Sequence, residues 1–154
     1  MKKVNISILA GCIFMIASCH KSPEKVERDF LKRAIERIDV NREYQWIVIL
    51  PGLGGHGCIQ EAEVFMQQYI ADRRILFVLT KISSLTILQQ KTEVRIDEHP
   101  NIYVDRENRF DIPTGNRIYP CTVYMNDGKM DDYFFQCPGN NAFRILENVI
   151  ALQQ

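Results

Sequence analysis

The sequence has no excess of charge of either sign, because 19 Lys and Arg residues balance 19 Asp and Glu residues. Domains that bind nucleic acids carry a basic excess toward the phosphates, so this balance argues against nucleic acid as a partner. No apolar run reaches the roughly 18–20 residues of a membrane-spanning helix. The 154 residues also contain no internal repeat and no low-complexity stretch. A length and composition of this kind suit one folded domain and exclude wholesale disorder.

The first 18 residues have the pattern of an export signal rather than of a folded segment. Lys2 and Lys3 precede a largely apolar run over residues 4–17. A basic leader, a short apolar stretch and small residues before the cut are the parts of a signal peptide. The segment Ile16-Ala17-Ser18-Cys19 resembles the lipobox of bacterial lipoproteins (apolar, small, small, Cys). This resemblance implies that Cys19 carries lipid on its sulfur and becomes the first residue of the mature chain.

We therefore expect a signal peptide over residues 1–18, a lipidated tether over residues 19–22 and a domain over residues 23–154. The expected location is the cell envelope, with the chain anchored to a membrane and facing the periplasm or the outside. Two alternatives are a plain secretory signal with a chance Cys and a retained membrane helix. The polar residues that follow Cys19 disfavour the second alternative. Cleavage leaves 17 basic against 19 acidic side chains.

Export changes what the cysteines imply. Three remain in the domain: Cys58, Cys121 and Cys137. In an oxidising compartment an odd number leaves at least one thiol unpaired or bound to a partner. If Asp127-Gly128 forms a two-residue hairpin loop, Cys121 lies opposite Phe134 and Cys137 lies on the other face of the hairpin. We therefore expect no disulfide, although a register slip of one residue would bring Cys121 and Cys137 to the same face.

The apolar periodicity alternates between helical and extended patterns. Ser22-Pro23-Glu24 is a typical helix start, with a capping hydroxyl, Pro in the first turn and an early acid. Asn126-Asp127-Gly128-Lys129 is a strong hairpin turn. Helices are predicted over residues 23–38, 58–70 and 83–92 and from residue 140 or 141 onward, and strands over residues 44–50, 75–80, 101–104, 122–125 and 132–136. This order predicts an α/β domain whose sheet begins parallel and ends in an antiparallel hairpin followed by a helix.

That order resembles the thioredoxin fold, with a central mixed sheet flanked by helices, and the resemblance covers about residues 23–152. Two local features carry it: a buried strand followed by a Cys at the mouth of a helix, and Tyr119-Pro120 before a strand and the Asn126-Asp127-Gly128 turn. Among exported lipoproteins, the sequence pattern of this chain is similar to that of TlpA-type thiol–disulfide proteins. The resemblance implies a cis Pro120 that faces the active-site thiol, and a role in thiol–disulfide exchange and cell redox homeostasis.

The active-site pattern departs from that family. The family motif is Cys-x-x-Cys, but this chain has Gly55-His56-Gly57-Cys58, so a two-thiol cycle within the tetrad is excluded. The family has a buried acid on the strand before the motif, and this chain has Ile49 at that position. Cys58 becomes the only candidate nucleophile. We expect the helix start to favour its thiolate, His56 to stabilise that thiolate and Pro120 to shape a partner groove. Release of a mixed disulfide then needs an external thiol, Cys121 or Cys137.

Two functions follow from these residues. The first is single-cysteine exchange with a thiol- or disulfide-bearing protein or peptide. The second is a redox-inactive thioredoxin-fold module that binds a peptide or protein partner, with Cys58 as a small, partly buried residue in a decayed site. Cys121 is expected to serve the core rather than catalysis. The oligomeric state does not follow from the sequence.

A dinucleotide-binding site and a metal site would each need further residues, and the sequence offers few candidates for them. Gly52-x-Gly54-x-x-Gly57 matches a dinucleotide-binding fingerprint, but the next strand ends in Thr80-Lys81 without the acid that holds the ribose. The glycines are explained more simply by unusual φ angles and close approach beside Cys58. A metal site built on His56 and Cys58 would need two further ligands, for which His99 and Cys121 are the only evident donors. We expect no cofactor and no resident metal.

Overall fold

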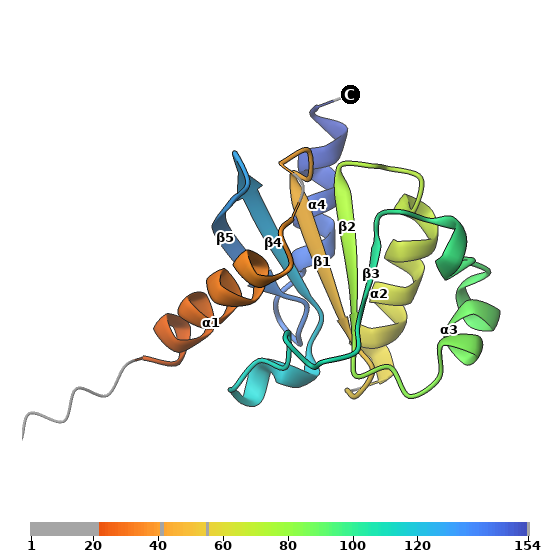
Figure 1. Cartoon of the computed structure of the whole chain (residues 1–154), viewed down its shortest axis with the longest axis horizontal. Coiled ribbons are helices and arrows are strands. Elements are labelled where there is room, and N and C mark those ends of the chain that lie inside the picture. Colours follow the sequence, from red (N-terminus) through yellow and green to blue (C-terminus); the bar gives the residue numbers. More distant parts are fainter. Residues whose placement is uncertain (1–21, 41, 55, 154) are drawn as a thin grey trace, which may run out of the picture.

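Five strands form one mixed sheet in the order β3-β2-β1-β4-β5 (Figure 1). The computed structural model describes residues 22–40, 42–54 and 56–153, with the side chain of His56 outside the description. β1 is parallel to β2, and β2 is parallel to β3, whereas β4 is antiparallel to both β1 and β5. The strands are β1 (Trp46–Pro51), β2 (Ile75–Thr80), β3 (Ile102–Asp105), β4 (Cys121–Asn126) and β5 (Lys129–Phe135).

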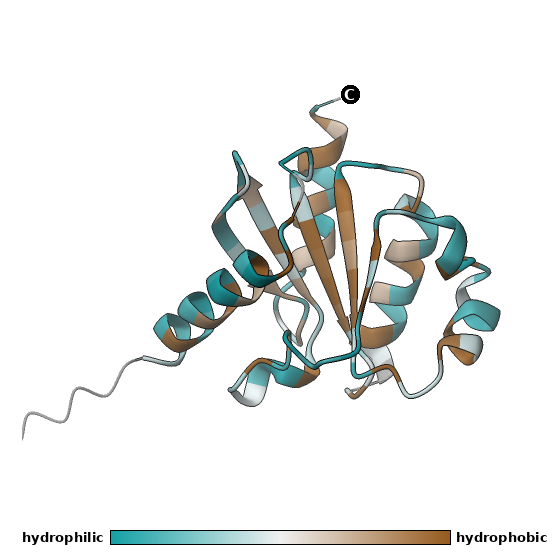
Figure 2. Ribbon diagram, in the orientation of Figure 1, coloured by the Kyte–Doolittle hydropathy of each residue, from teal (hydrophilic) through white to brown (hydrophobic). Residues whose placement is uncertain are grey.

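Helices cover both faces of the sheet and produce two hydrophobic cores. One face packs against α1 (Pro23–Arg37), and the other against α2 (His56–Tyr69), α3 (Leu85–Thr92) and α4 (Ala142–Ala151). Because β1 and β2 lie between these layers, every residue in both strands is buried. Figure 2 shows these central strands coloured mostly as hydrophobic. Alternate residues of β1 divide between the cores, Ile47 on the α1 side and Val48 on the α2 side.

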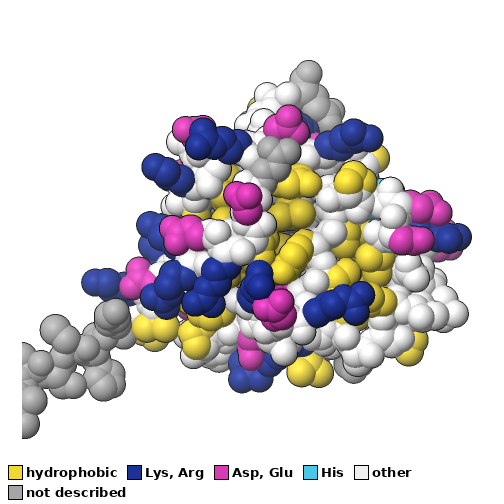
Figure 3. All heavy atoms as spheres, viewed as in Figure 1, with side chains coloured by type: hydrophobic (Ala, Val, Ile, Leu, Met, Phe, Trp, Pro, Cys, Tyr) yellow, Lys and Arg dark blue, Asp and Glu magenta, His cyan; other side chains and the backbone are white. Residues whose placement is uncertain are grey.

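The surface of α1 shows the expected amphipathic division. Leu31, Ala34 and Ile35 are buried against the sheet. Lys and Arg side chains gather along the outer side of this helix, next to hydrophobic side chains of the same molecular face (Figure 3). Within the described residues, none of the helices combines the length and the apolar character needed to cross a membrane.

The α/β class, the mixed sheet, the hairpin and the final helix are confirmed. Each predicted helix and strand is present, and most bounds differ by one or two residues. Ser22 and Ser84 cap α1 and α3 by accepting the N–H groups of Lys25 and Ile87. Among the described residues, two short 3-10 helices also occur: η1 (Ile96–Glu98) between α3 and β3, and η2 (Gly115–Ile118) between β3 and β4. Cys19 and the expected signal peptide over residues 1–18 lie outside the described residues.

The hairpin register corrects the expected pairing of Cys121. The turn has two central residues, as predicted, with φ of 48° at Asp127 and 73° at Gly128. A register shift between Tyr124 and Met125 then makes Cys121 pair with Phe135 rather than Phe134. The reason is a β-bulge, in which one strand contributes an extra residue. As a result, Cys137 packs against the same hydrophobic core as Cys121.

Candidate functional site

The predicted site residues Cys58 and Pro120 lie next to strands that meet at one end of the sheet, and so does Cys137, one of the thiols considered for release of a mixed disulfide. Ile49 near the end of β1 pairs with Cys121 at the start of β4, and Cys121 pairs with Phe135 at the end of β5. Helix α2 begins directly after β1, and α4 begins after β5. The first turns of both helices therefore lie at this end of the sheet (Figure 1).

Two glycines allow the loop between β1 and α2 to pack tightly against its neighbours. A Cβ on Gly52 would lie 2.1 Å from the carbonyl oxygen of Lys81, and a Cβ on Gly54 would lie 2.2 Å from that of Ile118. Close backbone approach is thus confirmed at both positions. Gly57 has open space around it, and none of these three glycines has a positive φ, so the expected unusual φ angles are wrong there.

Cys58 lies in the first turn of α2 and is partly exposed. Burial raises the pKa of its thiol, and the carboxylate of Glu61 and the thiol of Cys137 raise that pKa further. A backbone N–H favours the thiolate but does not outweigh these effects. The direction of this pKa shift runs against the expected favouring of the thiolate, because burial is the largest effect on the thiol. His56 is the first residue of α2, and its proposed help to the thiolate remains a prediction.

Cys58 and Cys137 border the same pocket, which has a volume of ≈ 380 Å³. Both sulfurs belong to free, partly exposed cysteines. The exposed Arg144 of α4 and Glu61 of α2 bring opposite charges to the wall of the pocket, and its other lining residues are Gln136, Pro138, Gly139, Asn140 and Asn141. The fold thus gathers two accessible thiols that are remote in sequence.

A tight turn holds Cys137 at the pocket. The backbone N–H of Cys137 donates to the carbonyl of Asn140 at 3.3 Å, and the N–H of Asn140 donates back at 2.9 Å. Between them lie Pro138 and Gly139, the latter with a φ of +86°. Pro followed by a residue with positive φ is the pattern of a type II turn. The turn ends where Asn141 precedes α4.

The buried Gln136 links three parts of this site. Its backbone N–H donates to the Pro120 carbonyl at 2.8 Å. Its side-chain Nε2 donates to Oε2 of Glu61, and its Oε1 accepts the backbone N–H of Phe143 at 3.1 Å. Sequence analysis missed Gln136. The available signal was a polar amide directly after the apolar end of a strand, where a buried amide needs partners.

Pro120 differs from the expectation that the family resemblance implied. The Tyr119–Pro120 peptide bond is trans, so the expected cis bond is wrong. Tyr119 has φ −102° and ψ 139°, the extended conformation that a residue before proline favours. Pro120 is buried and is not among the residues that border the pocket of Cys58 and Cys137. Its structural contribution is the carbonyl that receives Gln136.

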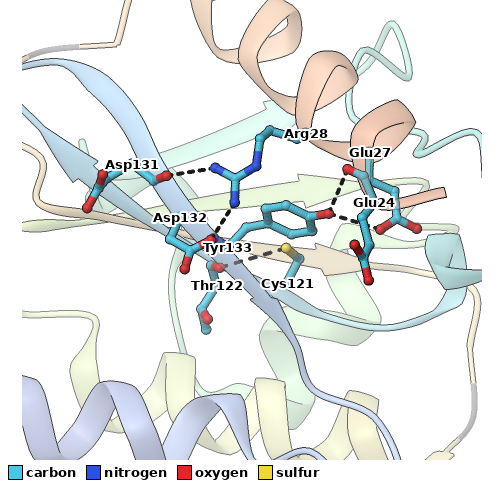
Figure 4. A network of polar contacts seen from close by, with 8 residues as sticks. All are labelled: Glu24, Glu27, Arg28, Cys121, Thr122, Asp131, Asp132 and Tyr133. Atoms are coloured by element: carbon cyan, nitrogen blue, oxygen red, sulfur yellow. Dashed lines mark hydrogen bonds and ion pairs between the residues drawn. The ribbon is translucent and has the colours of Figure 1, made fainter. Parts of the chain in front are cut away.

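Cys121 serves the core, as expected. Its side chain is 0% exposed. Burial strongly raises the pKa of this thiol, and the nearby Glu27 carboxylate adds to the effect. Figure 4 shows the sulfur beside Tyr133, and both residues belong to the core on the face of the sheet that α1 covers. This thiol is neither accessible nor activated in the folded chain.

A buried carboxylate, Glu27, anchors α1 beside Cys121. It accepts hydrogen bonds from the Thr114 hydroxyl, from Nδ2 of Asn116 at 2.9 Å and from the Tyr133 hydroxyl at 3.2 Å. The next residue, Arg28, donates to the carbonyl of Asp131 at 2.8 Å and to the carboxylate of Asp132 at 2.7 Å (Figure 4). Through these contacts α1 fixes both β5 and the segment that precedes Pro120.

The structure does not bring the suggested metal ligands together. No group of three His, Cys, Asp or Glu side chains suited to a metal occurs in the described part of the chain. His99 precedes β3, at the amino end of the parallel strands, whereas Cys58 follows the carboxyl end of β1. Cys121 is enclosed in the core.

The glycine loop also lacks the geometry of a dinucleotide site. Asp105 is the acid beside the end of β2, and its carboxylate is already bonded to the Thr80 hydroxyl and to the backbone N–H groups of Arg109 and Phe110, each at 2.9 Å. The pocket that borders Gly52 and Gly54 has a volume of ≈ 190 Å³. The close contacts of Gly52 and Gly54 therefore explain these glycines without a cofactor.

No family model, curated protein or solved structure matches the chain. The geometry of the pocket therefore carries the functional argument.

Proposed function

We propose that the chain is a lipid-anchored, extracytoplasmic protein whose thioredoxin-like domain exchanges thiols and disulfides with a protein or peptide through Cys58. The order of the elements supports the family resemblance, since a parallel first half precedes an antiparallel hairpin and a final helix. The lipobox-like sequence before Cys19 supports export and anchoring. The trans Pro120 and the absence of a first Cys in the tetrad set the domain apart from two-thiol members of that family.

The single observation that carries the proposal is the position of Cys58 at the border of an open pocket. Cys58 is partly exposed in the first turn of α2 and lines this pocket, whereas Cys121 is enclosed. Exchange begins when the Cys58 thiol loses its proton to solvent and the thiolate attacks a substrate disulfide. The substrate S–S bond breaks, a mixed disulfide forms on Cys58, and the released substrate sulfur takes up a proton.

The raised pKa of Cys58 sets the expected pH dependence of this step. Because the thiolate is the nucleophile, the exchange rate should rise through the alkaline range rather than reach a plateau below neutral pH. The same property favours the second candidate function, a redox-inactive module that holds a peptide or protein partner. That module would use the surface at this end of the sheet without covalent chemistry.

An alkylation and exchange experiment separates the two functions. The rate of iodoacetamide labelling at Cys58 is measured against pH, and the protein is then incubated with a peptide that contains a disulfide. Exchange predicts a saturable rate of mixed-disulfide formation that follows the labelling curve and is lost in Cys58→Ser. The absence of any mixed disulfide, together with full biological effect of Cys58→Ser, would establish the binding module instead.

Anchoring is tested separately in cells that process bacterial lipoproteins. The wild-type chain should incorporate labelled palmitate and fractionate with membranes. The Cys19→Ser variant should lose both properties, since sulfur is the acceptor of the lipid. Equal labelling of the two chains, or a soluble wild-type chain, would refute lipidation at Cys19.

A further inference from the structure

The three cysteines of the domain divide into one enclosed thiol and two accessible thiols that share a pocket. Cys121 is 0% exposed and lies in the core, whereas Cys58 and Cys137 are partly exposed. The odd number of cysteines thus leaves an even number that solvent reaches. In an oxidising compartment, two neighbouring accessible thiols are candidates for a bond with each other.

Independent contacts hold the two accessible thiols at the same pocket. Glu61 lies one helical turn after Cys58, and Gln136 immediately precedes Cys137. The hydrogen bond from Gln136 to Glu61 ties these two segments together. On the other side, the Cys137–Asn140 turn fixes the backbone of Cys137 through two hydrogen bonds. The arrangement therefore comes from polar contacts on both segments.

We propose that Cys58 and Cys137 form a reversible disulfide, with Cys137 as the thiol that releases the substrate from Cys58. This proposal rests on the proposed exchange function and supplies the second thiol that the tetrad lacks. It replaces the single-cysteine cycle by a pair drawn from the start of α2 and the turn before α4.

The full cycle balances with a disulfide-bearing protein or peptide as the oxidant. After the mixed disulfide forms on Cys58, the Cys137 thiol loses a proton and its thiolate attacks the sulfur of Cys58. The bond between Cys58 and the substrate breaks, and the Cys58–Cys137 bond forms. The second substrate sulfur leaves as a thiolate and takes up a proton. Two electrons pass from the two thiols of the chain to the substrate, which leaves as a dithiol.

The test uses the domain and a cyclic peptide closed by one disulfide. Wild-type protein should convert the peptide to its dithiol while Cys58 and Cys137 become unreactive to a thiol reagent, and peptide mapping should find these two residues joined. Cys137→Ser should instead accumulate a stable peptide adduct on Cys58. Cys58→Ser should release no reduced peptide, and Cys121→Ala should behave like the wild type.

The outcomes distinguish the pair from the exchange function itself. A peptide adduct that persists on Cys58 of the wild-type chain would overturn the pair and leave exchange through Cys58 intact. A bond between Cys121 and Cys137 would also overturn the pair. If neither the wild type nor Cys137→Ser forms any adduct or releases reduced peptide, the exchange function fails as well. Circular dichroism of each variant shows that it is folded before it is assayed.

Discussion

Gln136 donates its side-chain N–H to the carboxylate of Glu61, and this contact joins the end of β5 to the first turns of α2. The same amide accepts the N–H of Phe143, so it also holds the start of α4. The two helices begin beside Cys58 and Cys137. The geometry of the pocket that these thiols share therefore depends on Gln136, an uncharged side chain that takes no part in redox chemistry.

Replacing Gln136 by Ala should destabilise the domain by about 1–3 kcal/mol, because the buried N–H of Phe143 loses its acceptor. The free energy of unfolding in urea provides the measurement. Gln67→Ala is the matched control, since Gln67 is exposed on α2, and it should change stability by less than about 0.5 kcal/mol. Equal effects of the two substitutions would contradict the linking role of Gln136.

Gly54→Ala should cost about 1–3 kcal/mol, because the added methyl group would collide with the backbone carbonyl of Ile118. Gly57→Ala offers the contrast within the same segment, since its Cβ would meet open space in the first turn of α2. It should be neutral or stabilise by up to about 1 kcal/mol, as alanine favours helix over glycine. Thermal unfolding of both variants measures the difference in stability. A Gly54→Ala domain as stable as the wild type would show that the loop of Gly54 and the backbone of Ile118 are separated in solution.

Glu27→Ala should destabilise the domain by about 1–3 kcal/mol, because the hydroxyls of Thr114 and Tyr133 and the amide of Asn116 lose their shared acceptor. Glu36→Ala on the exposed side of α1 serves as the control and should stay within about 0.5 kcal/mol of the wild type. Urea unfolding compares them. A neutral Glu27→Ala substitution would mean that water satisfies these groups as well as the carboxylate does.

Ionisation of Cys121 should lower the free energy of unfolding of the domain as the pH rises above about 8.5, the ordinary pKa of a thiol. Burial raises the pKa of Cys121 in the folded chain, so the unfolded chain releases this proton first. Below about pH 8.5 the thiol is protonated in both the folded and the unfolded chain, so its contribution to stability is complete. Above it, stability falls by up to about 1.4 kcal/mol per pH unit.

The Cys121→Ala variant tests this dependence, because it removes the titrating group. Unfolding free energies are measured under reducing conditions from neutral pH to about pH 10. The stability difference between the wild type and Cys121→Ala should shrink steadily above about pH 8.5. A difference that stays constant across the range would show that Cys121 ionises equally in the folded and unfolded chains.

The elements were predictable because their signals are local. Six apolar residues among the seven of 44–50, followed by a glycine-rich loop, are enough to place a buried strand there, and a capping serine with Pro23 is enough to start α1. Contacts between distant segments were not predictable in this way. Glu27 belongs by composition to the charged side of α1, yet it is buried because three donors from other segments surround it.

The candidate site shows the same limit. The position of Cys58 at a helix start follows from the strand and loop before it. Its neighbour Cys137 does not, because that proximity depends on a one-residue bulge in the hairpin and on the turn before α4. The cis form of Pro120 was carried over from a family resemblance, whereas the Tyr119–Pro120 bond has the trans form that X–Pro bonds favour in general.

The contact between Arg28 and the Asp131 carbonyl has a consequence for self-association. An outermost strand presents unpaired backbone groups that can template the addition of strands from other molecules. In this chain the guanidinium of Arg28 occupies one such acceptor on β5, and α1 packs alongside. At the opposite border β3 is only four residues long. Both borders of the sheet are therefore poor templates for the growth of fibrils.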